Sequence, residues 1–205
     1  MAKVPSIKLG RVVQCESILE AEAAQLLDAC PGVLSFGEQP LILHYRYNGH
    51  HHWHIPDFAL VTEDGVRELI EIKFHKNVDN DVLWRTALLA DYLKPFGVAY
   101  RLLTERDIRS GHRLDNAKSL LRRGRERANE TWSLNTYERI RSQGSLALEQ
   151  FGWQQSGRQE AGWIAREIIE GQIRTNLLEP LSEKSCVVLE TLSLQEDRLW
   201  LPAVL

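Results

Sequence analysis

Apolar residues recur at helical spacing near the start of the chain. The positions that fall on one helical face are Ile18, Leu19, Ala23, Leu26 and Leu27. Ser17 and Glu20 have the spacing of a capping box, which begins a helix, and Cys30-Pro31-Gly32 ends the pattern. The pattern therefore predicts a helix between these two signals.

Strand-like stretches follow between residues 33 and 74. A short run at 33–36 precedes three longer ones at 41–47, 53–61 and 66–74. Asn48-Gly49 is typical of a hairpin turn, and Glu63-Asp64-Gly65 marks the next turn. We expect the three longer stretches to pair as a β-meander.

A helix and a buried strand come next. The pattern predicts a helix over about 81–93, which Lys94-Pro95-Phe96-Gly97 ends. The apolar run 98–103 predicts a buried strand, placed after a helix as in a crossover unit. Thr104 can cap a short helix through residue 109, and a further helix covers about 114–122. These elements predict a mixed α/β fold.

The composition becomes helical and polar around Gly124. We expect a boundary between about residues 122 and 133, with one domain over 1–125 and a second over 126–205. The second domain has predicted helices at 134–149 and 160–170, with Gly171 as a C-cap, and short strands at 185–189 and 198–201. Helices followed by a strand pair favour a small, mostly helical, winged-helix-like domain.

Composition narrows the class of protein. The chain of 205 residues is 43% hydrophobic and 26% charged, which suits one ordinary domain or a core domain with an appendage. The net charge of −3 means that nucleic-acid binding would need basic residues gathered locally. Three widely spaced cysteines favour a reduced, cytoplasmic setting over a disulfide framework. We find neither a secretory signal nor an apolar run that could span a membrane.

The stretch from Ile55 to Lys73 carries the candidate chemistry. Asp57 lies on one predicted strand, and Glu71-Ile72-Lys73 lies on the next. Side chains alternate faces along a strand, so Glu71 and Lys73 share a face. Carboxylates hold a hard divalent cation, and the lysine can position the attacking water. A lone Pro-Asp is more simply a bend with a solvated acid, but the combined arrangement indicates a metal-dependent phosphodiesterase.

A third acidic ligand is expected from the early helix. Glu16, Glu20 and Glu22 are the candidates, and we favour Glu20 over Glu16. Glu20 also has a structural explanation, because it is the reciprocal member of the predicted capping box. In this hypothesis Glu20, Asp57 and Glu71 hold the metal, and the backbone carbonyl of Ile72 completes the shell.

The order of these motifs resembles the PD-(D/E)XK nuclease superfamily. The matching positions are Glu20 on a helix, Pro56-Asp57 on a strand and Glu71-Ile72-Lys73 on the next strand. More narrowly, the chain is similar to the TnsA family, the endonuclease subunits of heteromeric transposases. The further segments with TnsA-like character are Ser17-Ile18-Leu19-Glu20, Glu38-Gln39-Pro40, Pro56-Asp57-Phe58, Thr104-Glu105-Arg106-Asp107-Ile108, and Ile168-Ile169-Glu170-Gly171-Gln172-Ile173 with Asn176-Leu177 and Pro180-Leu181. Some TnsA proteins have glutamine where this chain has Glu71.

The resemblance implies a concrete function. It implies a restriction-endonuclease-like core, with a mixed sheet flanked by helices, in a bacterial cytoplasmic protein. It also implies Mg²⁺-dependent cleavage of double-stranded DNA at the 5′ ends of a transposon in its donor site, with Mn²⁺ as a possible substitute. The partners it implies are a DDE transposase subunit (TnsB-like) and an AAA+ regulator (TnsC-like), the latter bound through the C-terminal domain.

Basic residues supply candidate DNA contacts. A basic run from His112 to Arg127 contains Lys118, Arg122, Arg123 and Arg125, and Lys76 and Arg85 flank the catalytic strand and the helix after it. Such a run is usually a solvated helix end. Beside a nuclease core it can form a phosphate-contacting track, in which Arg and Lys set position rather than read bases.

Other interpretations remain open. His50, His52 and His54 share a predicted strand face, with His44 across the hairpin, and imidazoles can bind zinc. Histidines at a turn are more simply solvated, however. For the whole chain, the alternatives are a stand-alone PD-(D/E)XK nuclease in restriction or repair, and an inactive nuclease fold that binds DNA or protein.

Overall fold

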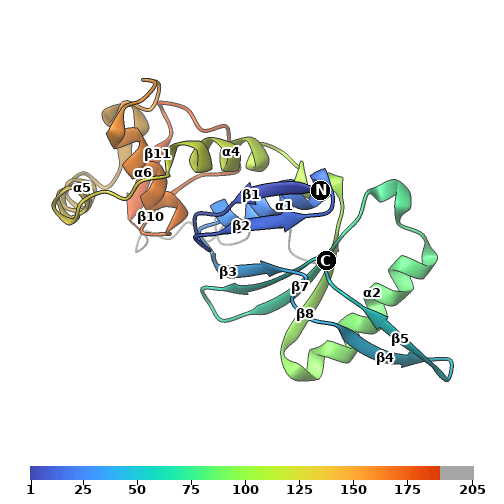
Figure 1. Ribbon diagram of the computed structural model, residues 1–205. Coiled ribbons are helices and arrows are strands. Elements are labelled where there is room, and N and C mark those ends of the chain that lie inside the picture. Colours follow the sequence, from blue (N-terminus) through green and yellow to red (C-terminus); the bar gives the residue numbers. More distant parts are fainter. Residues whose placement is uncertain (190–205) are drawn as a thin grey trace. The chain divides into compact units, whose positions relative to one another are not determined.

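The computed structural model describes residues 1–189. These residues form a mixed α/β protein with six α-helices and a mixed four-stranded sheet flanked by helices. They divide into two compact units (Figure 1). Among the described residues, the first contains 1–27 and 33–108, and the second contains 28–32 and 109–189. The division at 108/109 precedes the boundary expected at 125/126, because helix α4 packs on α6 of the second unit.

The first unit begins with a hairpin and a helix. Strands β1 (Ala2–Pro5) and β2 (Val12–Cys15) pair antiparallel, and α1 (Ile18–Ala29) follows. The Ser17 half of the predicted capping box forms, since Glu20 N donates to Ser17 Oγ at 3.1 Å. In the other half, Glu20 Oε2 accepts from Glu16 N at 2.7 Å, one residue before the expected donor Ser17 N. Leu19, Ala23, Leu26 and Leu27 are buried as expected, but Ile18 is exposed.

The central sheet has the strand order β3-β6-β7-β8. Its strands are β3 (Val33–Glu38), β6 (Phe58–Thr62), β7 (Arg67–Ile72) and β8 (Val98–Leu103). The first three are antiparallel neighbours, whereas β8 is parallel to β7. The connection between β7 and β8 contains a 3-10 turn (His75–Asn77), α2 (Asn80–Leu93) and a second 3-10 turn (Lys94–Phe96). The predicted crossover unit is therefore confirmed.

The predicted strand over 53–61 is two strands. Strand β5 (His50–His54) ends before Ile55-Pro56-Asp57, and β6 starts at Phe58. Pro56 cannot donate a ladder hydrogen bond and fixes its own φ, so the chain breaks there. As a result, β4 (Leu43–Tyr47) and β5 form a separate ribbon, and the predicted three-stranded meander is wrong. The Asn48-Gly49 turn is confirmed, with positive φ at both residues.

The ribbon and α2 cover one part of the sheet (Figure 1). Leu69 of β7, Tyr100 of β8, and Leu89 and Leu93 of α2 form a buried cluster. Leu43 and Tyr45 of β4 pack against this cluster. The ribbon is thus fixed to the sheet by its apolar face, which brings the end of β5 next to β7. The short helix α3 (Glu105–Ile108), which Thr104 precedes, ends the unit.

The second unit packs three helices with a small sheet. Its helices are α4 (Arg113–Arg123), α5 (Glu130–Gln143) and α6 (Gln159–Ile169). Its antiparallel sheet has the order β10 (Ile173–Thr175), β11 (Cys186–Leu189) and β9 (Leu146–Ala147). A 3-10 turn (Leu148–Phe151) follows β9. Helix α5 begins and ends earlier than the predicted 134–149, because Gly144 ends it, and the predicted strand at 198–201 lies outside the described residues.

Close approaches and buried polar contacts hold the second unit together. Gly124 and Gly162 let the end of α4 approach α6, since a Cβ on Gly162 would lie 3.0 Å from Arg123 O. Asn116 of α4 fixes the segment before β11, because its Nδ2 donates to Leu177 O and Glu179 O at 2.8 Å. Residues 28–32 belong here too: Pro31 O would lie 3.4 Å from a Cβ on Gly171. No helix among residues 1–189 is long and apolar enough to cross a membrane.

Candidate functional site

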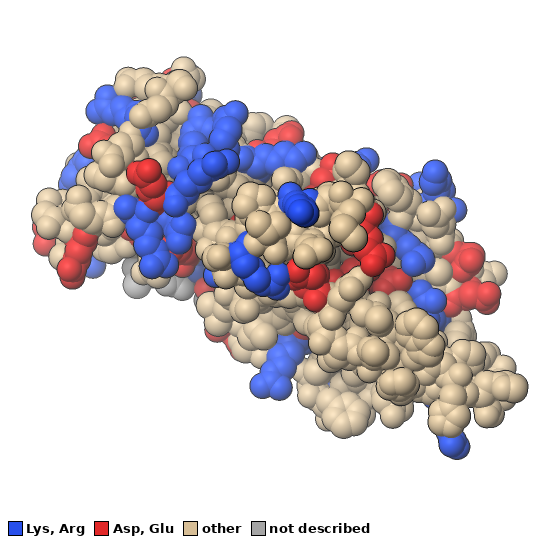
Figure 2. Space-filling view, in the orientation of Figure 1, with Lys and Arg blue, Asp and Glu red and all other residues tan. Residues whose placement is uncertain are grey.

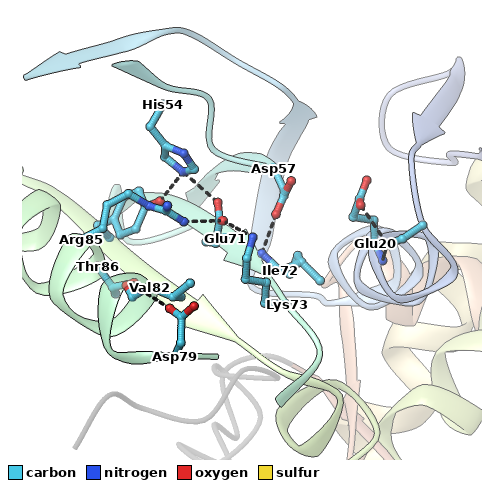
Figure 3. Close-up of polar contacts among 12 residues, drawn as sticks. Glu20, His54, Asp57, Glu71, Ile72, Lys73, Asp79, Val82, Arg85 and Thr86 are labelled. Carbon is cyan, nitrogen blue, oxygen red and sulfur yellow. Dashed lines mark hydrogen bonds and ion pairs between the residues drawn. The ribbon is translucent and has the colours of Figure 1, made fainter. Parts of the chain in front are cut away.

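Asp57 and the strand after it meet through a backbone hydrogen bond. Asp57 sits between Pro56 and β6, and its Oδ2 accepts a 2.5 Å hydrogen bond from Ile72 N at the end of β7 (Figure 3). Its other carboxylate oxygen has no hydrogen-bond partner among residues 1–189. One oxygen of the half-buried carboxylate is thus fixed by a hydrogen bond, and the other is free to accept a further contact. The sequence prediction that Asp57 lies beside the Glu71-Ile72-Lys73 strand is borne out by this contact.

Asp57 is a partly buried carboxyl group with two other acidic residues nearby. Burial raises its pKa to about 7, and the charges of Glu71 and Glu20 act in the same direction. The Ile72 amide and the Lys73 ammonium lower the pKa, but by less. Such a carboxyl is costly to ionise unless positive charge comes close.

Glu71 is a buried carboxylate with three charged or ionisable partners. Its Oε1 accepts hydrogen bonds from Lys73 Nζ at 3.0 Å and from Arg85 of α2 at 3.2 Å, and its Oε2 lies 2.8 Å from His54 Nε2. Burial alone would raise the pKa of Glu71, but the contacts with His54 and Lys73 outweigh it and lower the pKa. Figure 3 shows these groups converging on Glu71 from β5, α2 and its own strand.

His54 and Tyr100 extend this network. Tyr100 OH also lies 2.8 Å from His54 Nε2, so one ring nitrogen faces both Glu71 and the phenol. A ring nitrogen that bears a proton donates preferentially to the negatively charged acceptor, which here is Glu71. Burial and the nearby Glu71 charge raise the pKa of Tyr100, so the phenol stays protonated. His54 therefore acts as a bridge between β7 and β8.

Glu20 lies near this centre but is engaged elsewhere. Its charge contributes to the raised pKa of Asp57, which places it in the same neighbourhood. Both of its carboxylate oxygens accept capping hydrogen bonds, Oε1 from Ser17 Oγ at 2.8 Å and Oε2 from Glu16 N. The alternative helix acid, Glu16, accepts a 2.8 Å hydrogen bond from Gln39 Nε2 at an exposed position.

The carboxylates present are of the kind that binds a hard divalent cation. Among residues 1–189, however, fewer than three of them are grouped to hold one. Carboxylate oxygens are the ligands that Mg²⁺ prefers, usually one or two of them with several waters. Asp57 offers an unengaged oxygen, and Glu71 has roughly four acceptor positions of which three are used. In the part of the chain that the structure describes, no group of three or more His, Cys, Asp or Glu side chains is arranged to hold a metal ion.

The other predicted site residues are basic and belong to both units. Arg85 contacts Glu71 directly, whereas Lys76 is exposed on the 3-10 turn after β7. Lys118, Arg122 and Arg123 lie on α4 and Arg125 just beyond it, in the second unit. The histidines at the ribbon turn, from His50 to His52, are exposed, and only His54 reaches the carboxylates.

Sequence reasoning missed His54, Arg85 and Tyr100 as partners of Glu71. The signal for Tyr100 was the strand register: Leu69 pairs with Tyr100 in the parallel ladder, so Tyr100 shares the face of Glu71. The position of Arg85 follows from how α2 packs on the sheet, and no local pattern encodes it. No protein-family model matches this chain, and no curated protein is significantly similar to it.

Proposed function

We propose that this protein is a Mg²⁺-dependent DNA endonuclease that hydrolyses a phosphodiester bond. The observation that carries the proposal is the grouping of Asp57, Glu71 and Lys73 at the ends of two neighbouring strands. The helix–sheet–crossover arrangement from α1 to β8 is consistent with a PD-(D/E)XK core. The three helices and small antiparallel sheet of the second unit are consistent with a winged-helix-like domain.

In this proposal the residues have distinct roles. Asp57, Glu71 and the Ile72 carbonyl hold Mg²⁺ or Mn²⁺, with Glu20 as the helix ligand. A bound cation would polarise the scissile phosphate and activate a water. Lys73 orients the attacking water and neutralises developing charge, from a side chain that is 34% exposed and anchored to Glu71. Ile72 N keeps Asp57 Oδ2 in place, which leaves the other oxygen for the cation.

The test is cleavage of supercoiled plasmid DNA with Mg²⁺ or Mn²⁺ and with EDTA. The wild type should nick DNA only with metal. Lys73→Ala should retain metal binding but cleave at least about 100-fold more slowly, as expected for loss of a positioned catalytic group. Nicking that Lys73→Ala leaves unchanged would remove Lys73 from the mechanism.

We further propose a TnsA-like role in transposition, on the strength of the sequence motifs alone. In that role the protein cleaves 5′ transposon ends with a DDE transposase subunit and contacts an AAA+ regulator through the second unit. Genes for a DDE recombinase and an AAA+ ATPase beside this gene would support the role. A stand-alone nuclease in restriction or repair should instead cut purified DNA without partners.

Two observations favour an inactive nuclease fold used as a binding module. Both oxygens of Glu20 are used in the capping box, and residues 1–189 hold no ready-made group of three metal donors. Isothermal calorimetry with Mg²⁺ and Mn²⁺ separates the two possibilities. Heat of binding that disappears in Asp57→Asn supports the enzyme, and no heat from the wild type supports the binding module.

A further inference from the structure

The second unit contains a cavity of about 540 Å³. Its wall is formed by the end of α4, the segment 154–158 and the start of α6. Arg122, Arg123, Arg125 and Arg158 line it, whereas Glu126 is the one acidic residue in the lining. Figure 2 shows Lys and Arg side chains gathered where α4 and α6 lie in Figure 1. Positive charge is thus concentrated at this cavity, although the net charge of the chain is −3.

Two of these arginines are free to bind a ligand. Arg122 and Arg125 are exposed, and the side chain of neither makes a hydrogen bond or ion pair with any residue that the structure describes. Arg123 is instead fixed: its guanidinium stacks 4.6 Å from the Trp153 ring and donates to Trp153 O at 3.2 Å. Burial lowers the pKa of Arg123, and the nearby charge of Arg122 lowers it further.

The N-terminus of α6 adds to the positive potential of the cavity. Arg158 is the N-cap of this 11-residue helix and offers no side-chain acceptor to the first helical N–H groups. The guanidinium of Arg158 is held by Gln155 Oε1 at 2.9 Å and Glu160 Oε2 at 3.2 Å. The uncapped N–H groups carry partial positive charge and suit an anion.

We propose that this cavity binds a phosphate group of a DNA backbone, with Arg122 and Arg125 as the contacting side chains. Guanidinium groups match phosphate oxygens in geometry and charge. Exposed arginines at the mouth suit a polymer that lies across the surface, whereas a small free phosphate compound is usually enclosed by its pocket. The inference deepens the proposed function and rests on it, because it gives the DNA a holding point outside the carboxylate centre.

The test measures binding of a labelled DNA duplex to the full chain in EDTA, so that no cleavage occurs. Arg122→Glu/Arg125→Glu is compared with Arg141→Glu/Lys184→Glu, which makes the same charge change at exposed positions of the same unit outside the cavity. Because the side chains of Arg122 and Arg125 have no hydrogen-bond or ion-pair partners among the described residues, the substitution should leave thermal unfolding unchanged. Fluorescence anisotropy at several salt concentrations gives affinity and the number of phosphate contacts.

We expect the cavity variant to lose about 10-fold or more in affinity and to lower the salt slope by about 1 to 2, as for the loss of one or two phosphate contacts. The control variant should stay within about 2-fold of the wild type. Equal losses in the two variants would overturn the proposal. If ATP or inorganic phosphate binds the wild type but not the cavity variant, and the two variants do not differ on DNA, the proposal is overturned and the cavity is assigned to a small phosphate compound.

The outcome is separable from that of the proposed function. If the wild type binds DNA through this cavity but never cleaves it with metal, the endonuclease proposal fails and the binding site stands. If the wild type nicks DNA and the cavity variant binds and nicks like its control, the endonuclease proposal stands and the binding site fails.

Discussion

Nε2 of His54 lies 2.8 Å from Oε2 of Glu71, joining the end of the β4–β5 ribbon to the buried acid of β7. The ribbon does not share the hydrogen-bond ladder of the central sheet, yet it fixes the orientation of a candidate metal ligand. Partners that orient a ligand commonly change metal affinity or activity by 10–100-fold when removed. His54 is therefore a positioning residue in the proposed site.

His54→Ala should reduce metal affinity and cleavage by about 10–100-fold, because Oε2 of Glu71 loses its partner, whereas Oε1 keeps Arg85 when Lys73 is replaced. His54→Gln keeps an N–H donor and should recover part of the loss. His50→Ala, on the exposed turn of the same ribbon, serves as the control. A His54→Ala protein with the metal affinity of the wild type would contradict the positioning role.

Asp57→Asn should stabilise the metal-free protein. Since burial raises the folded-state pKa of Asp57 to about 7, the ionised carboxylate opposes folding above that pH. The penalty fades as pH falls from about 7 towards the unfolded value near 4, where both states are protonated. In EDTA we expect Asp57→Asn to melt roughly 2–4 °C higher at pH 8, for about 1 kcal/mol, and the gap to close towards pH 4.

Adding Mn²⁺ should reverse this order, because only the wild type gains from the cation. Differential scanning fluorimetry with and without metal provides the measurement. A wild-type melting temperature that is higher than that of Asp57→Asn in EDTA at pH 8 would contradict the electrostatic account of Asp57.

Substitutions at the start of α1 separate the two roles of Glu20. Glu20→Gln preserves a capping-box residue but removes the charge, whereas Ser17→Ala removes the cap but keeps the carboxylate. If Glu20 holds metal, Glu20→Gln should be stable and inactive. Ser17→Ala should lose about 1 kcal/mol of stability and remain active. Plasmid nicking combined with urea unfolding measures both properties, and an active Glu20→Gln would make Glu20 purely structural.

Gly124→Ala should destabilise the second unit. The added Cβ would lie 2.8 Å from Ile169 Cδ1 and 3.0 Å from the backbone N of Arg166, which cannot move away. Overpacking of this kind costs about 1–3 kcal/mol. Gly37→Ala is the matched control, since its Cβ would meet nothing closer than Arg11 at 4.0 Å. Equal unfolding midpoints for the two variants would contradict the close packing of α4 on α6.

Local signals predicted most of the elements, and long-range packing decided the rest. The capping box, the Asn48-Gly49 turn and the crossover helix all depend on neighbouring residues, so the sequence was sufficient for them. The break at Pro56 was hidden because the apolar pattern continues through it. Strands β4 and β5 lie outside the central sheet because β6 pairs with β3. No local sequence pattern specifies that pairing.

The same division holds for the candidate site. Asp57 directly precedes β6, and Glu71 and Lys73 lie at the end of its neighbour β7, so a hairpin prediction was enough to bring them together. His54 and Arg85 reach Glu71 from the ribbon and from α2, whose positions follow from tertiary packing. The sequence therefore predicted the acids and the lysine but not the groups that hold them.

Residues 28–32 have a consequence for how the protein is made. They belong to the second unit, and Gly171 approaches Pro31, although most of that unit lies beyond residue 109. During synthesis these residues leave the ribosome long before their partners exist. The second unit therefore becomes complete only when its C-terminal half has been translated, and a fragment that starts at residue 109 would lack part of its own packing.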